Sequence, residues 1–321
     1  MSRARYGGQA VMEGVMMRGP RDMAVAVRHP SGEIILHEET LNGAIYTARW
    51  SKLPIIRGMI AMWDTLVLGM RTLMFSANVA LAAEENAAKD GADPNRKPDA
   101  AEVESAMPQG VMWGTIALSL GLAVGLFFVL PVLAMGYLDR FITSSVVSNL
   151  VEKVIRLTLI LGYIGGIGFL PDIARVFAYH GAEHKAVNAH EAGAPLEVAS
   201  VREFTTVHPR CGTTFLMVVV LVSFVLFALL GQPPLLLRIA SRIVLIPVVA
   251  GIAYEFTRYA ANHYGSKAVR WIMAPGLVVQ KLTTREPDDS QLEVAISALK
   301  ATVAAEERRR VTTLVAEPTT A

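Results

Sequence analysis

Two long stretches without a charged residue limit what this chain can fold into. Residues 111–138 and 211–237 contain no Asp, Glu, Lys or Arg. An α-helix needs about 20 predominantly apolar residues to cross the hydrocarbon core of a bilayer. Both stretches are longer than that, so the sequence predicts a transmembrane helix in each.

Two other apolar stretches are shorter or interrupted. Residues 157–171 become long enough to span when they are extended to Val154, with Arg156 reaching its charged end toward the headgroups. Residues 239–256 carry Arg242 near the start and Glu255 near the end. We therefore expect a mainly α, polytopic helical membrane protein with about four transmembrane helices.

Lys and Arg are distributed unevenly around these four helices. The loops that follow the first and the third hold only Arg140, Lys153, Arg238 and Arg242, whereas the other segments are rich in both residue types. Basic loops stay on the cytoplasmic side. The bias predicts a protein integral to the cytoplasmic membrane, with both termini and the loop 172–212 in the cytoplasm. The first 30 residues lack the apolar core of a cleavable signal peptide.

Residues 1–52 are expected to form a small cytoplasmic β unit. "MAVAVRHPSGEIILHEE" has two β-rich runs on either side of a turn that contains Pro and Gly, which is typical of a hairpin. Upstream, "YGGQAVMEGVMMRGP" carries four glycines and ends in Gly-Pro. This composition indicates tight turns or close backbone approach.

Residues 53–86 are predicted to form an apolar helix that is interfacial or re-entrant rather than spanning. Arg57, Asp64 and Arg71 are spaced by seven residues, so they fall within about 40° of one another around a helix. Such a thin polar stripe suits a helix in the membrane plane. Spanning remains the alternative.

The rest of the chain divides into three segments. Residues 87–110 are polar and contain Pro and Gly, which is typical of a flexible linker. The transmembrane bundle is expected over 111–270, followed by a cytoplasmic C-terminal segment over 271–321. In that segment an amphipathic helix is expected after Asp288, because Leu292, Ile296 and Leu299 recur at helical spacing.

The densest group of titratable side chains is "YHGAEHKAVNAHE", residues 179–191. His180 and His184 are four positions apart, so on a helix they share one face and can bind one divalent cation. Glu183 completes the order H-x-x-E-H, in which two histidines hold zinc and the Glu activates a metal-bound water. The motif predicts a divalent metal site, with zinc as the first candidate.

A catalytic zinc needs a third protein ligand from elsewhere in the chain. Glu255 is the first candidate, because an acidic residue at the end of an apolar helix is expected to be functional. His208 and Cys211 in "HPRCG" and Glu13 in the glycine-rich stretch are the others. Glu191 shares the angular stripe but lies about 10 Å beyond His184 along the axis. The alternative is a structural network in which these groups pair with Arg.

Four blocks of the sequence resemble one family of bacterial membrane proteins of unknown function, the YqhQ-like family. They are "YGGQAVMEGVMMRGP", "YHGAEHKAVNAHE", "HPRCGTTF" and "PGLVVQKLTTREPDD", and the similarity runs from about Tyr6 to Leu299. The family is labelled a predicted metal-dependent enzyme, so the resemblance implies a metal site without naming a reaction. The residues it singles out are Gly7, Gly8, Glu13, Gly14, Arg18, Gly19, Pro20, His180, Glu183, His184, His208, Arg210 and Cys211.

Three functions are compatible with these patterns. The first is a metal-dependent, hydrolase-like membrane enzyme with its site at the cytoplasmic interface. The second is a non-catalytic scaffold or regulator that offers a cytoplasmic docking platform to a protein partner. The third is a transporter, for which a homo-oligomer would have to supply missing walls. The bilayer is the expected partner in all three, and a net charge of +2 gives no reason to expect nucleic acid.

Overall fold

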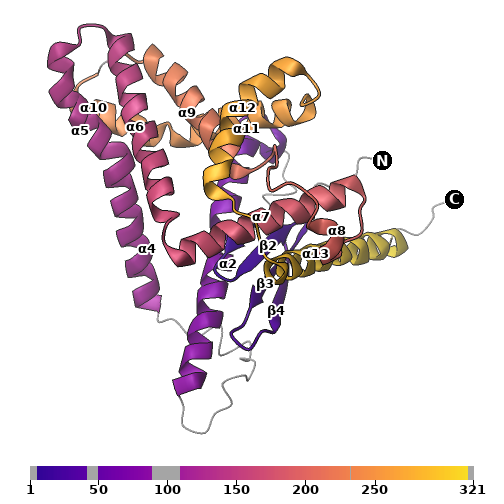
Figure 1. The fold of residues 1–321 in the computed structure, drawn as a ribbon. Helices are drawn as coiled ribbons and strands as arrows, with labels where there is room; N and C mark the ends of the chain where they lie inside the picture. The colour runs from indigo at the N-terminus through magenta and orange to yellow at the C-terminus, as the bar shows by residue number, and fades with distance from the viewer. Residues whose placement is uncertain (1–5, 42–49, 89–108, 232, 317–321) are drawn as a thin grey trace.

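The computed structural model describes residues 6–41, 50–88, 109–231 and 233–316. These residues form a mainly helical protein with one small antiparallel sheet at the N-terminal end (Figure 1). The predicted linker 87–110 and parts of both terminal segments fall largely outside the described residues. The coarse architecture expected from the sequence is thus confirmed.

The β unit is a four-stranded antiparallel meander with the strand order β1-β2-β3-β4. The strands are β1 Gly7–Val11, β2 Gly14–Arg18, β3 Asp22–Arg28 and β4 Ile34–Thr40. The predicted hairpin around "HPSG" is confirmed, because Arg28 pairs with Ile34 across that turn. Gly32 has φ +91° there, a conformation that favours glycine. The upstream hairpin turns at Glu13, which has φ 50°.

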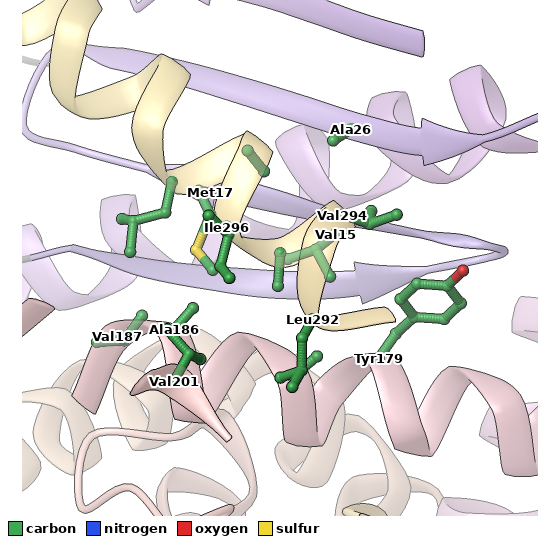
Figure 2. Packing of buried hydrophobic residues seen from close by; sticks show 14 of the residues in the cluster. Val15, Met17, Ala26, Tyr179, Ala186, Val187, Val201, Leu292, Val294 and Ile296 are labelled. Carbon is green, nitrogen blue, oxygen red and sulfur yellow. The ribbon is translucent and has the colours of Figure 1, made fainter. Parts of the chain in front are cut away.

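Both faces of this sheet are covered by helices. Val25 and Val27 of β3 pack with Leu68 and Val79 of α2 (Ile56–Ala88). The alternate residue Ala26 belongs to a cluster on the opposite face, formed with α7 (Pro171–Ala192) and α13 (Asp289–Ala316). Figure 2 shows this second cluster between the strands and the two helices. Burial on both faces explains why "MAVAV" is apolar without interruption.

The start of α13 is fixed by reciprocal side-chain caps. Asp288 Oδ1 accepts a hydrogen bond from the backbone N–H of Gln291 at 2.9 Å, and Gln291 Oε1 accepts one from the N–H of Asp288 at 3.0 Å. This is a capping box, and it confirms the helix start expected at this position. Leu292, Ile296 and Leu299 then pack into the core cluster, so α13 holds the C-terminal segment on the sheet.

The apolar helices form a second layer. The elements are α4 Gln109–Val124, a π-helical turn η2 Gly125–Val129, α5 Leu130–Leu138, α6 Ser145–Ile167, α9 Gly212–Leu229, α10 Leu235–Val244, α11 Ile246–Asn262 and α12 Lys267–Thr283, with short helices η1 Trp50–Lys52, η3 Asp139–Phe141 and α8 Val198–Val201. Residues 56–84, 113–141 and 212–229 are each long and apolar enough to cross a membrane. If each of two bent helix pairs counts as one span, the number of candidate spans among the described residues rises from 3 to 5.

One of the bent pairs carries the histidine motif out of the apolar layer. α6 and α7 meet at an angle of 101°, and Pro171 stands in the first turn of α7. After the bend α7 packs on β1 and β2 and on α13 (Figure 1). The weaker stretch predicted over 157–171 therefore ends at this bend. The motif after it lies on a helix that covers the sheet.

Candidate metal centre

His180 and His184 lie side by side on α7, as their spacing predicts. Their ring centroids are 4.4 Å apart, and the rings are inclined at 63°. Gly181 lets this part of α7 approach the segment after α12, because a Cβ at Gly181 would lie 2.0 Å from the carbonyl oxygen of Arg285. Close packing against the backbone therefore explains why a glycine stands between the two histidines.

Backbone carbonyl groups hold both imidazole rings. His180 Nδ1 lies 2.8 Å from the carbonyl oxygen of Thr283, and His184 Nδ1 lies 2.6 Å from that of Thr206. A carbonyl oxygen only accepts hydrogen bonds, so each Nδ1 carries a proton. The lone pair of each neutral ring is then on Nε2. This arrangement is typical of histidines that bind a metal through Nε2.

Cys211 supplies the third donor atom. Its sulfur lies 3.2 Å from His180 Nε2, and ligand atoms of His180, His184 and Cys211 all lie within 4.8 Å of one another. The side chain is buried just before α9, at the end of the loop that follows α8. Two imidazoles and a thiolate form a donor set that zinc uses in proteins, where three protein ligands leave a fourth position open. The residues present thus fit zinc.

His208 extends the cluster on the side of His184. Its ring centroid is 5.7 Å from that of His184, and its Nε2 lies 3.7 Å from a carboxylate oxygen of Glu191. Gln280 fixes the backbone on both sides, accepting from His208 N–H at 2.8 Å and donating to its carbonyl at 3.0 Å. His208 Nε2 is buried without a hydrogen bond from the described part of the chain. Burial lowers the pKa of His208.

Glu183 lies on the side of α7 that faces the sheet. A Cβ at Gly8 of β1 would lie 3.0 Å from Glu183 Cγ, so the two are in close contact. Burial raises the pKa of the Glu183 carboxyl, with a smaller opposite effect from His180. His180 contacts Cys211 and the backbone of Thr283 instead, and His184 contacts the backbone of Thr206. The structure therefore separates the acid of the motif from the face that gathers the donor atoms.

The structure does not bring Glu255 or Glu13 to the histidine pair. Glu255 on α11 forms a two-pronged ion pair with Arg57 of α2, with Arg57 Nε 2.5 Å from Glu255 Oε1. Glu13 accepts two hydrogen bonds of 2.5 Å from Arg175, near the start of α7. Each carboxylate is thus occupied by an arginine.

The other predicted site residues lie near the cluster or on the sheet. Arg210, the residue directly before Cys211, forms an ion pair with Glu191. His208 and Arg210 lower the pKa of Glu191 to about 2, the contact with His208 being the larger cause. Arg18 of β2 pairs with Asp64 of α2 at 2.5 Å, between sheet and helix. The carbonyl groups of Thr206 and Thr283 orient the two rings. Because every residue has a backbone carbonyl, the sequence alone could not identify these two.

The fold and the cluster together define a mainly helical protein with apolar helices long enough to cross a membrane and a buried histidine–cysteine group. The chain belongs to a family described as a protein of unknown function, DUF1385, which matches residues 53–305. It is 33% identical over 304 residues to the "Uncharacterized protein YqhQ" of Bacillus subtilis (strain 168), covering 91% of this chain and 90% of that protein. No solved structure matches the chain. The family confirms the resemblance seen in the sequence and names no reaction.

Proposed function

We propose that this protein is a metal-dependent membrane enzyme, hydrolase-like, with its centre at the cytoplasmic interface. One observation carries the proposal. Two neighbouring imidazoles are each held through Nδ1 by a backbone carbonyl group, and ligand atoms of both rings lie within 4.8 Å of each other and of the buried thiol of Cys211. A purely structural histidine pair has no need for a third soft donor atom at that position.

His180, His184 and Cys211 would hold the metal. When bound at such a centre, zinc acts as a Lewis acid and lowers the pKa of a water molecule to about 7. The carbonyls of Thr283 and Thr206 would keep the two rings in place, so that little reorganisation accompanies binding. Three protein ligands leave room for a substrate atom or water, which is the requirement for catalysis rather than for a structural site.

His208 is the residue best placed to contact a group at the open position. Its ring centroid lies 5.7 Å from that of His184, and its Nε2 lies 3.7 Å from a carboxylate oxygen of Glu191. Glu191, which is itself paired with Arg210, would hold the orientation of this ring. We propose His208 for the proton-handling role that the motif alone would give to Glu183, because Glu183 contacts β1 instead.

The distribution of exposed apolar residues supports a membrane location. Trp113, Leu118 and Leu122 on α4 are 64%, 66% and 66% exposed, far more than a soluble surface of this length would leave to water. The basic loops favour a cytoplasmic position for α7, the sheet and both termini. α2 packs on the sheet through Leu68 and Val79. This contact supports the interfacial position of α2, because spanning would take the charged strand β4 into the hydrocarbon.

A cytoplasmic scaffold is the second candidate. It is favoured by the layered unit that α2, the sheet, α7 and α13 form, which offers a platform to a protein partner. In that case the histidine–cysteine cluster only fixes α7 to the loop before α9. Substitution of His208 by Gln, which keeps a hydrogen-bonding side chain of similar size, would then leave function intact, whereas an enzyme would lose turnover.

Elemental analysis of the detergent-purified full chain tests the proposal. We expect about one zinc ion per chain in the wild type. His184→Ala should abolish it. The matched control is His263→Ala, because His263 is an exposed histidine that bonds to the carbonyl of Tyr259 outside the cluster. Wild-type protein that is prepared without chelator and contains no stoichiometric metal would overturn the proposal.

A further inference from the structure

A second polar cluster lies among the apolar helices, on α6 and α10. Lys153, Arg156 and Arg242 surround the carboxylate of Glu152, and these four residues are between 2% and 7% exposed. Arg156 Nη2 lies 3.0 Å from Glu152 Oε1, and Arg242 Nη2 lies 3.1 Å from Oε2. Lys153 Nζ lies 3.8 Å from Oε1. From the sequence, Lys153 and Arg242 were assigned to different loops and Arg156 to the headgroup region. The sequence therefore did not predict this cluster.

The charges of this cluster do not balance. Three cationic side chains share a single carboxylate. Asp139, which accepts a hydrogen bond from Ser148 of α6, is bound to a cation of its own, with Arg238 Nη1 3.0 Å from Asp139 Oδ2. An excess of basic groups over acidic groups is therefore left in an apolar surrounding. Uncompensated charge is costly there, and ionisable residues within apolar helices usually mark a functional site.

The hydrogen bonds do not balance either. Lys153 Nζ, Arg156 Nε and Arg242 Nη1 are buried, and none has a hydrogen-bond acceptor among the residues that the structure describes. Phe227 lies under two of the cations, 4.0 Å from the Arg242 guanidinium and 4.5 Å from Lys153 Nζ. Such a ring attracts a cation but supplies neither a full acceptor nor a negative charge.

The cluster is independent of the metal centre. It lies in the first half of α6, whereas the bend into α7 follows Ile167, about 22 Å farther along the helix axis. In Figure 1 the first half of α6 lies with α10 at the end of the apolar layer away from the sheet. A ligand here would not share atoms with one bound between His180 and Cys211.

We propose that this cluster binds an oxyanion of the phosphate class. An excess of basic groups calls for an anion, and three buried N–H groups without an acceptor call for several acceptor oxygens on one ligand. Guanidinium groups match tetrahedral oxyanions in geometry, and an ammonium group adds a point charge. Inorganic phosphate and a lipid headgroup with a phosphate monoester share this chemistry.

Thermal unfolding of the full chain in nanodiscs distinguishes the two sources. In discs of phosphatidylcholine, added inorganic phosphate should raise the melting temperature if the ligand is the free anion. In phosphate-free buffer, discs that contain phosphatidate should show the rise if it is a headgroup. A rise in either arm supports the site. Equal melting temperatures across both arms would overturn it.

Lys153→Met separates anion binding from a structural role. Loss of one charge-assisted contact should weaken the response to the anion about tenfold. The variant should melt no lower than the wild type without the anion, because it removes an uncompensated buried charge. If Lys153 only stabilises the fold, the variant melts lower and keeps its full response, which contradicts the proposal. Arg140→Gln is the control, since Arg140 is exposed and lies outside the cluster. His184→Ala should also keep the full response to the anion. If the anion bound to zinc at the histidine–cysteine cluster instead, His184→Ala would abolish the response.

Discussion

The Nε2 nitrogen of His180 lies 3.2 Å from the sulfur of Cys211, although 31 positions separate the two residues in the chain. α7 carries the histidine, and the loop before α9 carries the cysteine. The contact is therefore made where the helix on the sheet meets the apolar layer. A ligand that binds both groups would fasten these two parts of the protein together.

The role of the thiol can be tested by Cys211→Ser. A hydroxyl is a much poorer zinc ligand than a thiolate, so we expect zinc affinity to fall about tenfold or more. The cobalt-substituted wild type should show a thiolate charge-transfer band that the variant lacks. Thr213→Val is the control, because its hydroxyl contacts the same sulfur at 3.3 Å without belonging to the donor set. A variant that keeps wild-type affinity would remove Cys211 from the site.

Gly181→Ala should disturb the same site through packing. The added Cβ would lie 2.0 Å from the carbonyl oxygen of Arg285, so backbone must move. Overpacking of this kind costs about 1–3 kcal/mol. It should also displace the Thr283 carbonyl from His180 and weaken zinc binding. Gly162→Ala on α6 is the control, because a Cβ there meets no atom within 4 Å. Equal zinc affinity in both variants would contradict the packing argument.

Glu255→Gln should leave the metal content unchanged. The carboxylate pairs with Arg57 and lies outside the histidine–cysteine group. The substitution should instead loosen the contact between α2 and α11, by about 1 kcal/mol or less for a partly exposed pair. Elemental analysis beside a melting curve separates the two effects. Loss of zinc in this variant would restore Glu255 as the third ligand.

The attachment of α13 to the sheet should weaken in acid. Arg309 donates hydrogen bonds of 2.6 and 2.7 Å to Asp22 and lowers the pKa of that carboxyl. A lowered folded-state pKa contributes stability above the unfolded value, about 3.9, and this contribution is lost as the pH falls through the folded value. Hydrogen-exchange protection of residues 301–312 should therefore drop below about pH 4.

Asp22→Asn is the variant that checks this pH dependence. It should lower protection of the same amides at pH 7 by about 1 kcal/mol and remove the difference between neutral and acid pH. Glu307→Gln, at an exposed position of the same helix, should behave as the wild type. An acid-induced loss that persists in Asp22→Asn would have another cause.

The position of the sheet relative to the bilayer can be tested with a single added cysteine. Glu33→Cys lies in the turn between β3 and β4. In a Cys211→Ser background, it should react with a membrane-impermeant maleimide only after intact cells are opened. Phe141→Cys, between α5 and α6, should react from outside. Reversed labelling would overturn the predicted orientation.

The apolar helices could be predicted because absence of charge over more than 20 residues is a local property. The shared face of His180 and His184 also followed from helical spacing alone. Cys211 was one of several candidates for the third donor, and spacing could not single it out, because only the folded loop between α8 and α9 brings it to the pair. Glu255 was the first candidate because it is an acid at the end of an apolar helix, but its partner Arg57 is 198 positions away in the chain. The buried cations were missed for the same reason, since Arg242 and Glu152 meet only in three dimensions.

X-ray absorption at the zinc edge of the purified wild-type chain tests the central claim most directly. We predict a first shell of two imidazole nitrogens and one sulfur at about 2.3 Å, with a light atom in the remaining position. The sulfur contribution should vanish in Cys211→Ser. A shell made of nitrogen and oxygen alone, or protein that takes up no zinc, would contradict the account.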